Sequence, residues 1–462
     1  MSEQISSALI SRRTLLRRGA AAAAVVAGLP LGSWPTGASV AEGARRLARR
    51  GIANVRVSRD HYGVHIEPFV AANPRHPRQL LAACQASHTA NPEFIATYLS
   101  LDAGATWRNG GLPQPPRGKF PAGDDVTVAF DPHGRGYVCA SATGRSDADR
   151  AIYAWRTDDG GRRFSEPVTL VAGGSYFDHP GIAGGPGQTP SERNVYVVWA
   201  SNGNQGGDSV AMRRSTDGGH NFERPRTILN AHHPSTSSSG PKIVAGAHGL
   251  VCVVGDALSH WDASADMVAQ AVAVCSTDAG HSFAAPIRLG WESLNMSLPG
   301  HVIANSGVTV TAAPNHDALY VAFVRRRRGS NHSAIVVRAS YDRGRTWSKA
   351  VTATPNDAVT YFQPNLAADA AGHVAISAFA LANGRINEVL LLSGPHELRF
   401  RAPLRVTTAP FNPHSPTATG RKHGAWWIGD YQGITASRGA FHLVWNDTRT
   451  GKLDLFAATI RP

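Results

Sequence analysis

The chain has 462 residues, with 46 Lys and Arg against 33 Asp and Glu, so its formal net charge is +13. Hydrophobic residues make up 42% and charged residues only 17%, and the chain contains 47 glycines and 29 prolines. This composition argues against a helical or disordered chain and favours a soluble, turn-rich β protein. The positive charge favours polyanions, acidic glycans or anionic surfaces as partners, or reflects a coding bias toward arginine, and it names no ligand.

The N-terminal stretch SRRTLLRRGAAAAAVVAGLPLGSW places Arg12 and Arg13 before an apolar run. That run is too short to span a bilayer, and Pro30 breaks it, so no stable membrane insertion is expected. We predict a signal peptide over residues 1–41 and a basic linker over 42–52. The paired arginines resemble a twin-arginine export signal, which implies an extracellular or cell-envelope location. An ordinary secretory signal or an uncleaved anchor is the alternative.

An octet that begins with a hydroxyl residue, SLDAGATW at position 100, recurs through the chain. It returns as TDDGGRRF, STDGGHNF, STDAGHSF and SYDRGRTW, and the weaker SGPHELRF follows, at positions 157, 215, 276, 340 and 393. Successive octets start 53 to 64 residues apart, and a repeat of this length indicates one supersecondary unit repeated around an axis or along a solenoid. Each octet predicts a hairpin corner. The acid at the third position accepts backbone hydrogen bonds, and the glycine at the fifth position allows a positive φ angle. The aromatic residue at the eighth position packs between sheets.

A second repeat predicts the innermost strands. Seven short runs, EPFVAA, DVTVAF, HPGIAG, GPKIVA, SGVTVT, QPNLAA and DYQGIT, each open a β-rich segment. The seventh unit is one strand short, and ANVRVS at 53–58 is left over. We therefore predict an all-β, seven-bladed β-propeller over 53–462, with four-stranded antiparallel blades and closure by the N-terminal strand. Six blades with an irregular cap is the alternative.

The chain has four cysteines and no CxxC motif. Cys252 and Cys275 fall on consecutive predicted strands at nearly mirrored distances from their loop, so a cross-strand disulfide is geometrically feasible. Cys84 and Cys139 occupy matching strands of neighbouring repeats and are expected to be buried thiols.

The starts of the inner strands carry residues suited to chemistry on a polar or acidic sugar. They are expected to converge on the face opposite the octets, where carboxylates can act as acid and base and arginines can grip a carboxylate. The candidate catalytic residues are Glu67, Asp178, His179, Asp430 and Tyr431. The candidate substrate-binding residues are Asp125, Lys242, Tyr361, Gln363, Gln432 and Arg449. For any single residue, the alternative is a purely structural hydrogen bond.

The octets resemble the Asp-box, S-x-D-x-G-x-T-W. Together with IEPFVAANPRHPRQLLAA and GDYQGITASRGAFHLVWNDTRTGKLDLF, they make nearly the whole mature chain resemble secreted bacterial BNR-repeat, sialidase-like β-propellers. The resemblance implies a glycoside hydrolase, with a tyrosine such as Tyr361 or Tyr431 as a hypothetical nucleophile. The Arg-Ile-Pro signature of true sialidases is missing, so their arginine triad is not carried over. The alternatives are a polysaccharide lyase, with His179 or a tyrosine as the base, and a non-catalytic glycan- or protein-binding propeller.

No phosphate-binding loop, zinc-ligand spacing or nucleic-acid motif is found in the sequence. We therefore expect a glycan or polysaccharide as the partner and no nucleic acid. The chain is expected to be a monomer without a cofactor or catalytic metal, and a structural calcium ion in the channel is left open. The long connections 223–239, 291–305 and 409–425 are expected to lie over the same face as the inner-strand starts.

Overall fold

The computed structural model describes residues 52–88, 94–116, 122–143, 150–173, 177–187, 189, 192–202, 208–230, 240–261, 267–314, 316–327, 330–414 and 426–462. These residues contain 30 β-strands and no helix, and they belong to one compact unit, Gly37–Pro462. The predicted signal peptide lies outside the described residues. Within the described part of the chain, no helix is long and apolar enough to cross a membrane.

The described strands pair into seven sheets, which we number along the chain. Sheet 1 contains β2 (Val64–Ala72), β3 (Leu80–Ser87), β4 (Phe94–Ser100) and β5 (Arg108–Asn109). Sheet 2 contains β6 (Ala122–Phe130), β7 (Gly136–Thr143), β8 (Arg150–Thr157) and β9 (Val168–Ala172). Sheet 3 contains β10 (Phe177–Pro186), β11 (Arg193–Asn202), β12 (Asp208–Ser215) and β13 (Arg226–Asn230).

Sheet 4 is larger and contains β14 (Lys242–Ala245), β15 (Val251–Trp261), β16 (Met267–Ser276), β17 (Ile287–Leu298), β18 (Val302–Asn305) and β27 (Trp426–Trp427). Sheet 5 contains β19 (Thr309–Ala312), β20 (Leu319–Arg326), β21 (Ser333–Ser340) and β22 (Val351–Thr352). Sheet 6 contains β23 (Thr360–Ala368), β24 (Val374–Ala382), β25 (Arg385–Leu392) and β26 (Leu404–Arg405). Sheet 7 contains β28 (Gly433–Ser437), β29 (Ala440–Asp447), β30 (Asp454–Ile460) and β1 (Val55–Arg56).

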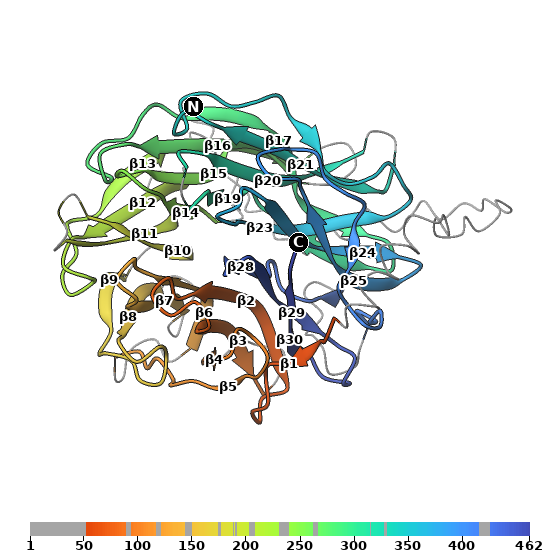
Figure 1. The fold of residues 1–462 in the computed structure, drawn as a ribbon, viewed down its shortest axis with the longest axis horizontal. Helices are drawn as coiled ribbons and strands as arrows, with labels where there is room; N and C mark the ends of the chain where they lie inside the picture. The colour runs from red at the N-terminus through yellow and green to blue at the C-terminus, as the bar shows by residue number, and fades with distance from the viewer. Residues whose placement is uncertain are drawn as a thin grey trace, which may run out of the picture. The chain divides into compact units, whose positions relative to one another are not determined.

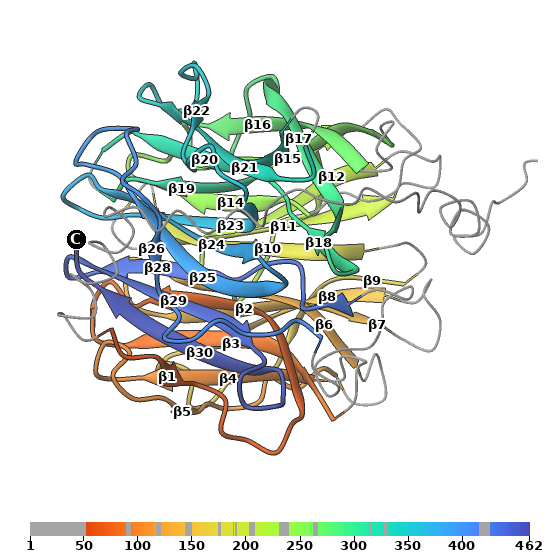
Figure 2. The same cartoon turned by 90° about the vertical axis from the view of Figure 1, so that its right-hand side faces the viewer.

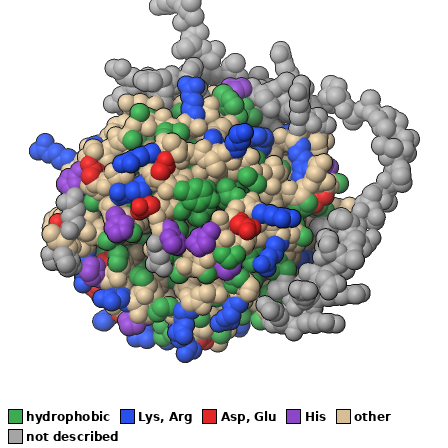
Figure 3. All heavy atoms as spheres, turned by 45° about the horizontal axis from the view of Figure 1, so that its top comes forward, with side chains coloured by type: hydrophobic (Ala, Val, Ile, Leu, Met, Phe, Trp, Pro, Cys, Tyr) green, Lys and Arg blue, Asp and Glu red, His purple; other side chains and the backbone are tan. Residues whose placement is uncertain are grey.

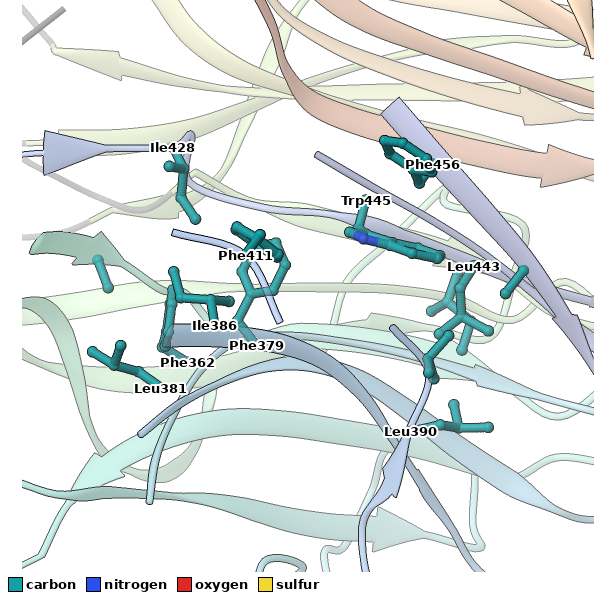
Figure 4. Close-up of a cluster of buried hydrophobic side chains, with 14 of the residues drawn as sticks. Phe362, Phe379, Leu381, Ile386, Leu390, Phe411, Ile428, Leu443, Trp445 and Phe456 are labelled. Carbon is teal, nitrogen blue, oxygen red and sulfur yellow. The ribbon is translucent and has the colours of Figure 1, made fainter. Parts of the chain in front are cut away.

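The sheets follow one another around a closed ring, the arrangement of a β-propeller (Figures 1 and 2). The innermost strands contact each other in the order β2, β6, β10, β14, β19, β23 and β28, and β28 in turn contacts β2. Hydrophobic clusters fill the spaces between successive sheets. The cluster in Figure 4, mainly between sheets 6 and 7, includes Phe362, Phe379, Phe411 and Trp445, all of them fully buried. The core is therefore divided among the sheet interfaces.

The N-terminal strand closes the ring, as predicted. Strand β1 pairs antiparallel with β30, with Val55 opposite Ala457 and Arg56 opposite Phe456. Just beyond this strand, the Ser58 hydroxyl donates a 2.9 Å hydrogen bond to the buried Asp454 carboxylate. The first described strand thus completes the last sheet.

The five strong octets share one hydrogen-bonding pattern, which matches the predicted corner. In the first, the Ser100 hydroxyl donates to Asp102 and accepts from Gly104 N–H, both at 2.8 Å, and Thr106 N–H donates to Asp102 at 2.8 Å. The pattern repeats around Asp159, Asp217, Asp278 and Asp342. The φ angle of the glycine lies between 76° and 100° in all five, namely at Gly104, Gly161, Gly219, Gly280 and Gly344.

The aromatic residue that ends each octet packs between two sheets. Trp107 is part of the cluster between sheets 7 and 1. Phe164, Phe222, Phe283 and Trp347 pack against the clusters at the next four interfaces. The octet therefore joins a hairpin corner to a sheet interface.

The disulfide that the sequence allows and the two buried thiols that it predicts are present in the structure. Cys252 on β15 lies directly opposite Cys275 on β16, and the two form a disulfide. Cys84 and Cys139 are buried free thiols.

We predict that Asp217→Ala lowers the free energy of unfolding by about 1–2 kcal/mol, because hydrogen bonds from Ser215, His220 and Asn221 lose their acceptor. Burial opposes the shift, but these hydrogen bonds, led by that from Asn221, lower the pKa of Asp217 to about 2. The stabilisation should therefore be present above pH ~4 and be lost as the pH falls through about 2. Denaturant unfolding at pH 7 measures the effect.

The control is Asp158→Ala in the neighbouring octet. The Asp158 side chain is 73% exposed, and its ion pair with Arg135 is a surface contact worth about 0–1 kcal/mol. Equal destabilisation by the two substitutions would contradict a structural role for the octet acid.

Candidate active site

Backbone irregularities at the starts of the inner strands position the candidate residues. The pairing register shifts between Ile66 and Phe69 in β2, and equivalent shifts occur in β6, β10 and β23. Three residues inside these bulges, Glu67, His179 and Gln363, have positive φ angles of 57°, 49° and 50°, and each precedes a proline. A non-glycine residue in this region costs free energy, and such residues cluster at functional sites.

Two glycines allow neighbouring segments to approach these strained residues. A Cβ atom on Gly240 would lie 2.1 Å from the Cβ of His179, and one on Gly429 would lie 2.9 Å from the Cγ of Glu67. Both glycines have positive φ, 78° and 94°. Any side chain at either position would displace the residue that faces it.

Asp125 lies at the centre of the candidate site. It is 4% exposed, its carboxylate is 2.9 Å from His179 Nδ1, and it accepts a 3.2 Å hydrogen bond from the Tyr431 hydroxyl. The Tyr431 oxygen also accepts a 3.1 Å hydrogen bond from Val126 N–H. Lys242 Nζ lies 5.0 Å from the centroid of the Tyr431 ring. Residues from β6, β10 and β14 and from the segment before β28 therefore meet at one place.

The carboxyl groups around Asp125 differ in proton affinity. Burial acts to raise the pKa of Asp125, but the positive charge of His179 and its hydrogen bond hold it far below its usual range. Burial raises the pKa of Asp178 to about 7, against the attraction of His179 and with repulsion from Asp125 and Asp124. Burial and repulsion from Asp125 raise the pKa of Asp124 to about 6. The site therefore combines one acid that stays ionised with two acids whose pKa values are raised toward neutrality.

The cations at the site respond to this negative field. Burial lowers the pKa of His179, but Asp125 and Asp178 outweigh it and raise the pKa to about 9. Burial lowers the pKa of Lys242, against the attraction of the surrounding acids. Arg150 Nη1 lies 3.4 Å from carboxylate oxygens of both Asp124 and Asp178. His179 is therefore a cation at neutral pH.

Asp430 and Glu67 form a second part of the site. One Asp430 oxygen accepts hydrogen bonds from Trp427 Nε1 at 2.5 Å and from Asn305 Nδ2 at 2.8 Å. The Asp430 N–H donates to Glu67 at 3.0 Å, and Gln85 donates to the other Glu67 oxygen. Two strands outside the inner ring, β18 and β27, therefore hold the Asp430 side chain.

Gln363 and Gln432 line the adjoining inner strands. Gln363 Nε2 donates to Gly429 O at 2.5 Å, and Gln432 Nε2 donates to Gln363 O at 3.2 Å. Both side chains are buried. Their amides link sheets 6 and 7 beside Glu67.

Two predicted binding residues lie away from this group. Tyr361 packs in the cluster between sheets 5 and 6, and its hydroxyl donates to Asp357 at 3.0 Å. Arg449 pairs with the buried Asp447 and lies 4.5 Å from the Phe456 ring centroid. The structure thus gives both of them structural contacts.

The predicted connection 291–305 is a hairpin, the end of β17 with β18, rather than a loop. Strand β18 pairs in parallel with β27, with Val302 opposite Trp426. This hairpin reaches the site, because its last residue, Asn305, binds Asp430. Parts of the other two connections, 231–239 and 415–425, lie outside the described residues.

Sequence reasoning missed the buried acids Asp256 and Glu292. They are 7% and 1% exposed, and burial, with the charge and hydrogen bonding of Asp256, raises the pKa of Glu292 well above its usual range. The charge of Asp256 also acts on Lys242. No sequence pattern distinguishes these two acids as site residues, because Asp256 follows the ordinary apolar run VCVVG and Glu292 lies in the equally ordinary stretch LGWESL.

Asp125, Asp178 and His179 could also hold a metal ion, because their ligand atoms all lie within 4.8 Å of one another. Calcium prefers an all-oxygen shell, whereas two carboxylates and an imidazole suit zinc or manganese. The structural calcium ion that the sequence leaves open is therefore a poor match for this set.

Neither a family model nor a curated protein matches the chain. Solved structures do match in fold. The GH93 α-L-arabinofuranosidase of Fusarium graminearum with arabinobiose is 10% identical, with 88% of this chain and 97% of that chain covered and a TM-score of 0.51. A Hadza microbial sialidase, Hz136, is 13% identical, with 88% and 68% covered and a TM-score of 0.48. An ulvan lyase of family PL25 is 10% identical, with 86% and 94% covered and a TM-score of 0.47.

We predict that the His179 imidazole titrates with a pKa of about 9 in NMR spectra, above its ordinary value of 6.5. Asp125→Asn should lower this pKa by roughly 1–3 units, because the charge at 2.9 Å is removed. The ion pair should stabilise the fold fully below pH 6.5, and this contribution should be lost as the pH rises through about 9.

Asp158→Asn, on an exposed octet acid, is the control and should leave the His179 titration unchanged. An ordinary pKa for His179 in the unaltered protein would contradict the geometry described for Asp125.

Proposed function

We propose that this protein is an exported, seven-bladed β-propeller of the sialidase-like superfamily, with Asp-box corners, and that it hydrolyses an acidic or polar glycan. The seven sheets, the shared octet geometry and the pairing of β1 with β30 support the blade count. Function is argued from the site, because the fold hosts many activities.

The observation that carries the hydrolase proposal is the opposite pKa shift of two neighbouring carboxyls. Asp125 is ionised, and Asp178 holds its proton to about pH 7. Glycosidases use such a pair, one carboxyl as general acid and the other as base or nucleophile. His179 links the two, with ring nitrogens 2.9 Å from Asp125 and 3.9 Å from Asp178.

The roles follow from these protonation states. Asp178 gives its proton to the leaving glycosidic oxygen as the bond to the anomeric carbon breaks. The Tyr431 oxygen attacks that carbon and passes its phenolic proton to Asp125, which already accepts its hydrogen bond. The developing bond to the sugar must offset burial and the nearby acid charges, which raise the pKa of Tyr431 well above its usual range. A water molecule then attacks the same carbon and gives its proton to Asp178, and Asp125 returns its proton to the departing Tyr431 oxygen, so that all three side chains regain their starting states. Arg150, beside Asp178, binds a carboxylate on an acidic sugar.

A lyase that uses His179 as its base is less well supported. Proton abstraction needs a neutral imidazole, whereas a pKa of about 9 keeps His179 protonated at pH 7. Unsaturated, ultraviolet-absorbing products would nevertheless identify a lyase directly.

We predict that purified protein releases reducing sugar from at least one substrate in a panel of sialylated glycans, arabinans and uronic-acid polysaccharides. Asp178→Asn should lower kcat by about 10²–10⁴-fold, because the general acid is lost. Activity should fall as the pH rises through about 7, where Asp178 loses its proton.

Asp158→Asn is the matched control and should keep full activity, because Asp158 is an exposed surface acid. Binding of a panel glycan without turnover would contradict the hydrolase and support the non-catalytic propeller. Turnover that is unchanged in Asp178→Asn would contradict the assigned acid.

Export and a monomeric state are parts of the same proposal. The Arg12–Arg13 pair supports the twin-arginine route. Replacing both arginines with lysine should retain the chain in the cytoplasm, and cell fractionation measures this.

A further inference from the structure

A cavity of about 320 Å³ lies between sheets 5 and 6, at the octet end of the strands. Its lining includes Tyr320, Tyr341, His316, His396 and Asp317. Strand β23 begins near the candidate active site at Gln363, and the turn after it, at Gly372, reaches the cavity. The extended chain from Gln363 to Ala368 alone covers roughly 16 Å before the turn that reaches the cavity, so the cavity lies away from the candidate active site.

The aromatic rings of the cavity are arranged in two perpendicular pairs. Tyr320 and Tyr341 have centroids 6.4 Å apart at 87°, and His316 and His396 have centroids 5.2 Å apart at 81°. The His396 ring lies against Gly372, where a Cβ atom would come within 2.5 Å of it. Asp317 Oδ1 lies 3.7 Å from Arg343 Nε, so this half-exposed carboxylate is held by an ion pair at the edge of the cavity. The cavity thus combines ring faces with hydroxyl, imidazole and carboxylate groups.

Tyr341 is not required by the octet in which it lies. The turn depends on Ser340, Asp342 and Gly344, and the second octet position is Leu, Asp or Thr in the other strong octets. The Tyr341 side chain is 59% exposed. Figure 3 shows one face of the molecule on which histidines lie close to apolar surface. Tyr341 thus adds an exposed ring face at the edge of the cavity, and the octet turn does not need its side chain.

We infer that this cavity is a second, non-catalytic glycan-binding site, which holds one pyranose unit. A pyranose has a face of C–H groups, which can pack on the electron-rich face of Tyr341, and a rim of hydroxyls for Asp317 and the imidazoles. The volume is at the low end for ligand sites, as one sugar unit requires. Because the rings of each pair are perpendicular, a nucleobase would find no two parallel ring faces between which to stack.

The choice of a glycan as the ligand rests on the proposed function. If the substrate is a polysaccharide, the second site binds another part of the same chain and raises its effective concentration near the active site. Short soluble substrates gain nothing from such a site. The two sites can therefore be tested separately.

The experiment uses saturation-transfer NMR on the full chain, with galactose, N-acetylglucosamine, glucuronic acid and N-acetylneuraminic acid as probes. At least one sugar should receive saturation from the unaltered protein and from Asp178→Asn. Tyr341→Ala should weaken its binding at least 10-fold, and His396→Ala should weaken it as well. Leu101→Ala, the same octet position in sheet 1 and also exposed at 44%, should have no effect.

Each result decides the matter. Binding that survives in Tyr341→Ala, or the absence of binding by every probe, would overturn the second site. Loss of binding in Asp178→Asn alone would assign the sugar to the active site and support only the proposed function. Thermal unfolding of each variant shows that it is folded, and Tyr341 is exposed enough for alanine to be tolerated.

Discussion

The structure depends on the pairing of its first described strand with its last. Strand β1 supplies the outer edge of sheet 7, and the fully buried Asp454 fixes it by accepting hydrogen bonds from Ser58 and Arg56 at 2.9 Å. Val57 is part of the cluster between sheets 7 and 1, so the same segment fills the last interface of the ring. Without it, the edge of β30 would be open and the two ends of the chain would be held only by packing.

Closure of the ring explains why the candidate active site lies among the innermost strands. The inner strands contact one another in a ring, so residues from distant parts of the chain are brought within hydrogen-bonding distance. Several acids meet Lys242, His179 and Arg150 there, and burial prevents all the acids from ionising together. The acid nearest to His179, Asp125, takes the charge, and Asp178 keeps its proton. The strained backbone at Glu67 and His179 is tolerated because bulges and glycines surround it.

The corners and the inner strands could be predicted from the sequence because both depend on local chemistry. A serine, an acid and a glycine at fixed spacing make the same turn wherever they occur, and the leftover strand at 53–58 pointed to closure. Side-chain direction could not be predicted. Tyr361 and Gln363 lie two residues apart, yet Tyr361 packs in a sheet interface whereas Gln363, inside the bulge of β23, donates to Gly429 in the segment before β28. Asp256 and Glu292 were missed because only the folded sheet brings two such acids together.

The central claim is that ring closure assembles the carboxylate site. The most direct test compares two chains, one beginning at Ile52 and one beginning at Arg59, which lacks β1 and Ser58. The account predicts that the shorter chain unfolds at a lower temperature and that its His179 pKa falls from about 9 toward 6.5, because the strands that carry His179 and Asp125 are no longer held together. An unchanged unfolding temperature with an unchanged His179 titration would contradict it.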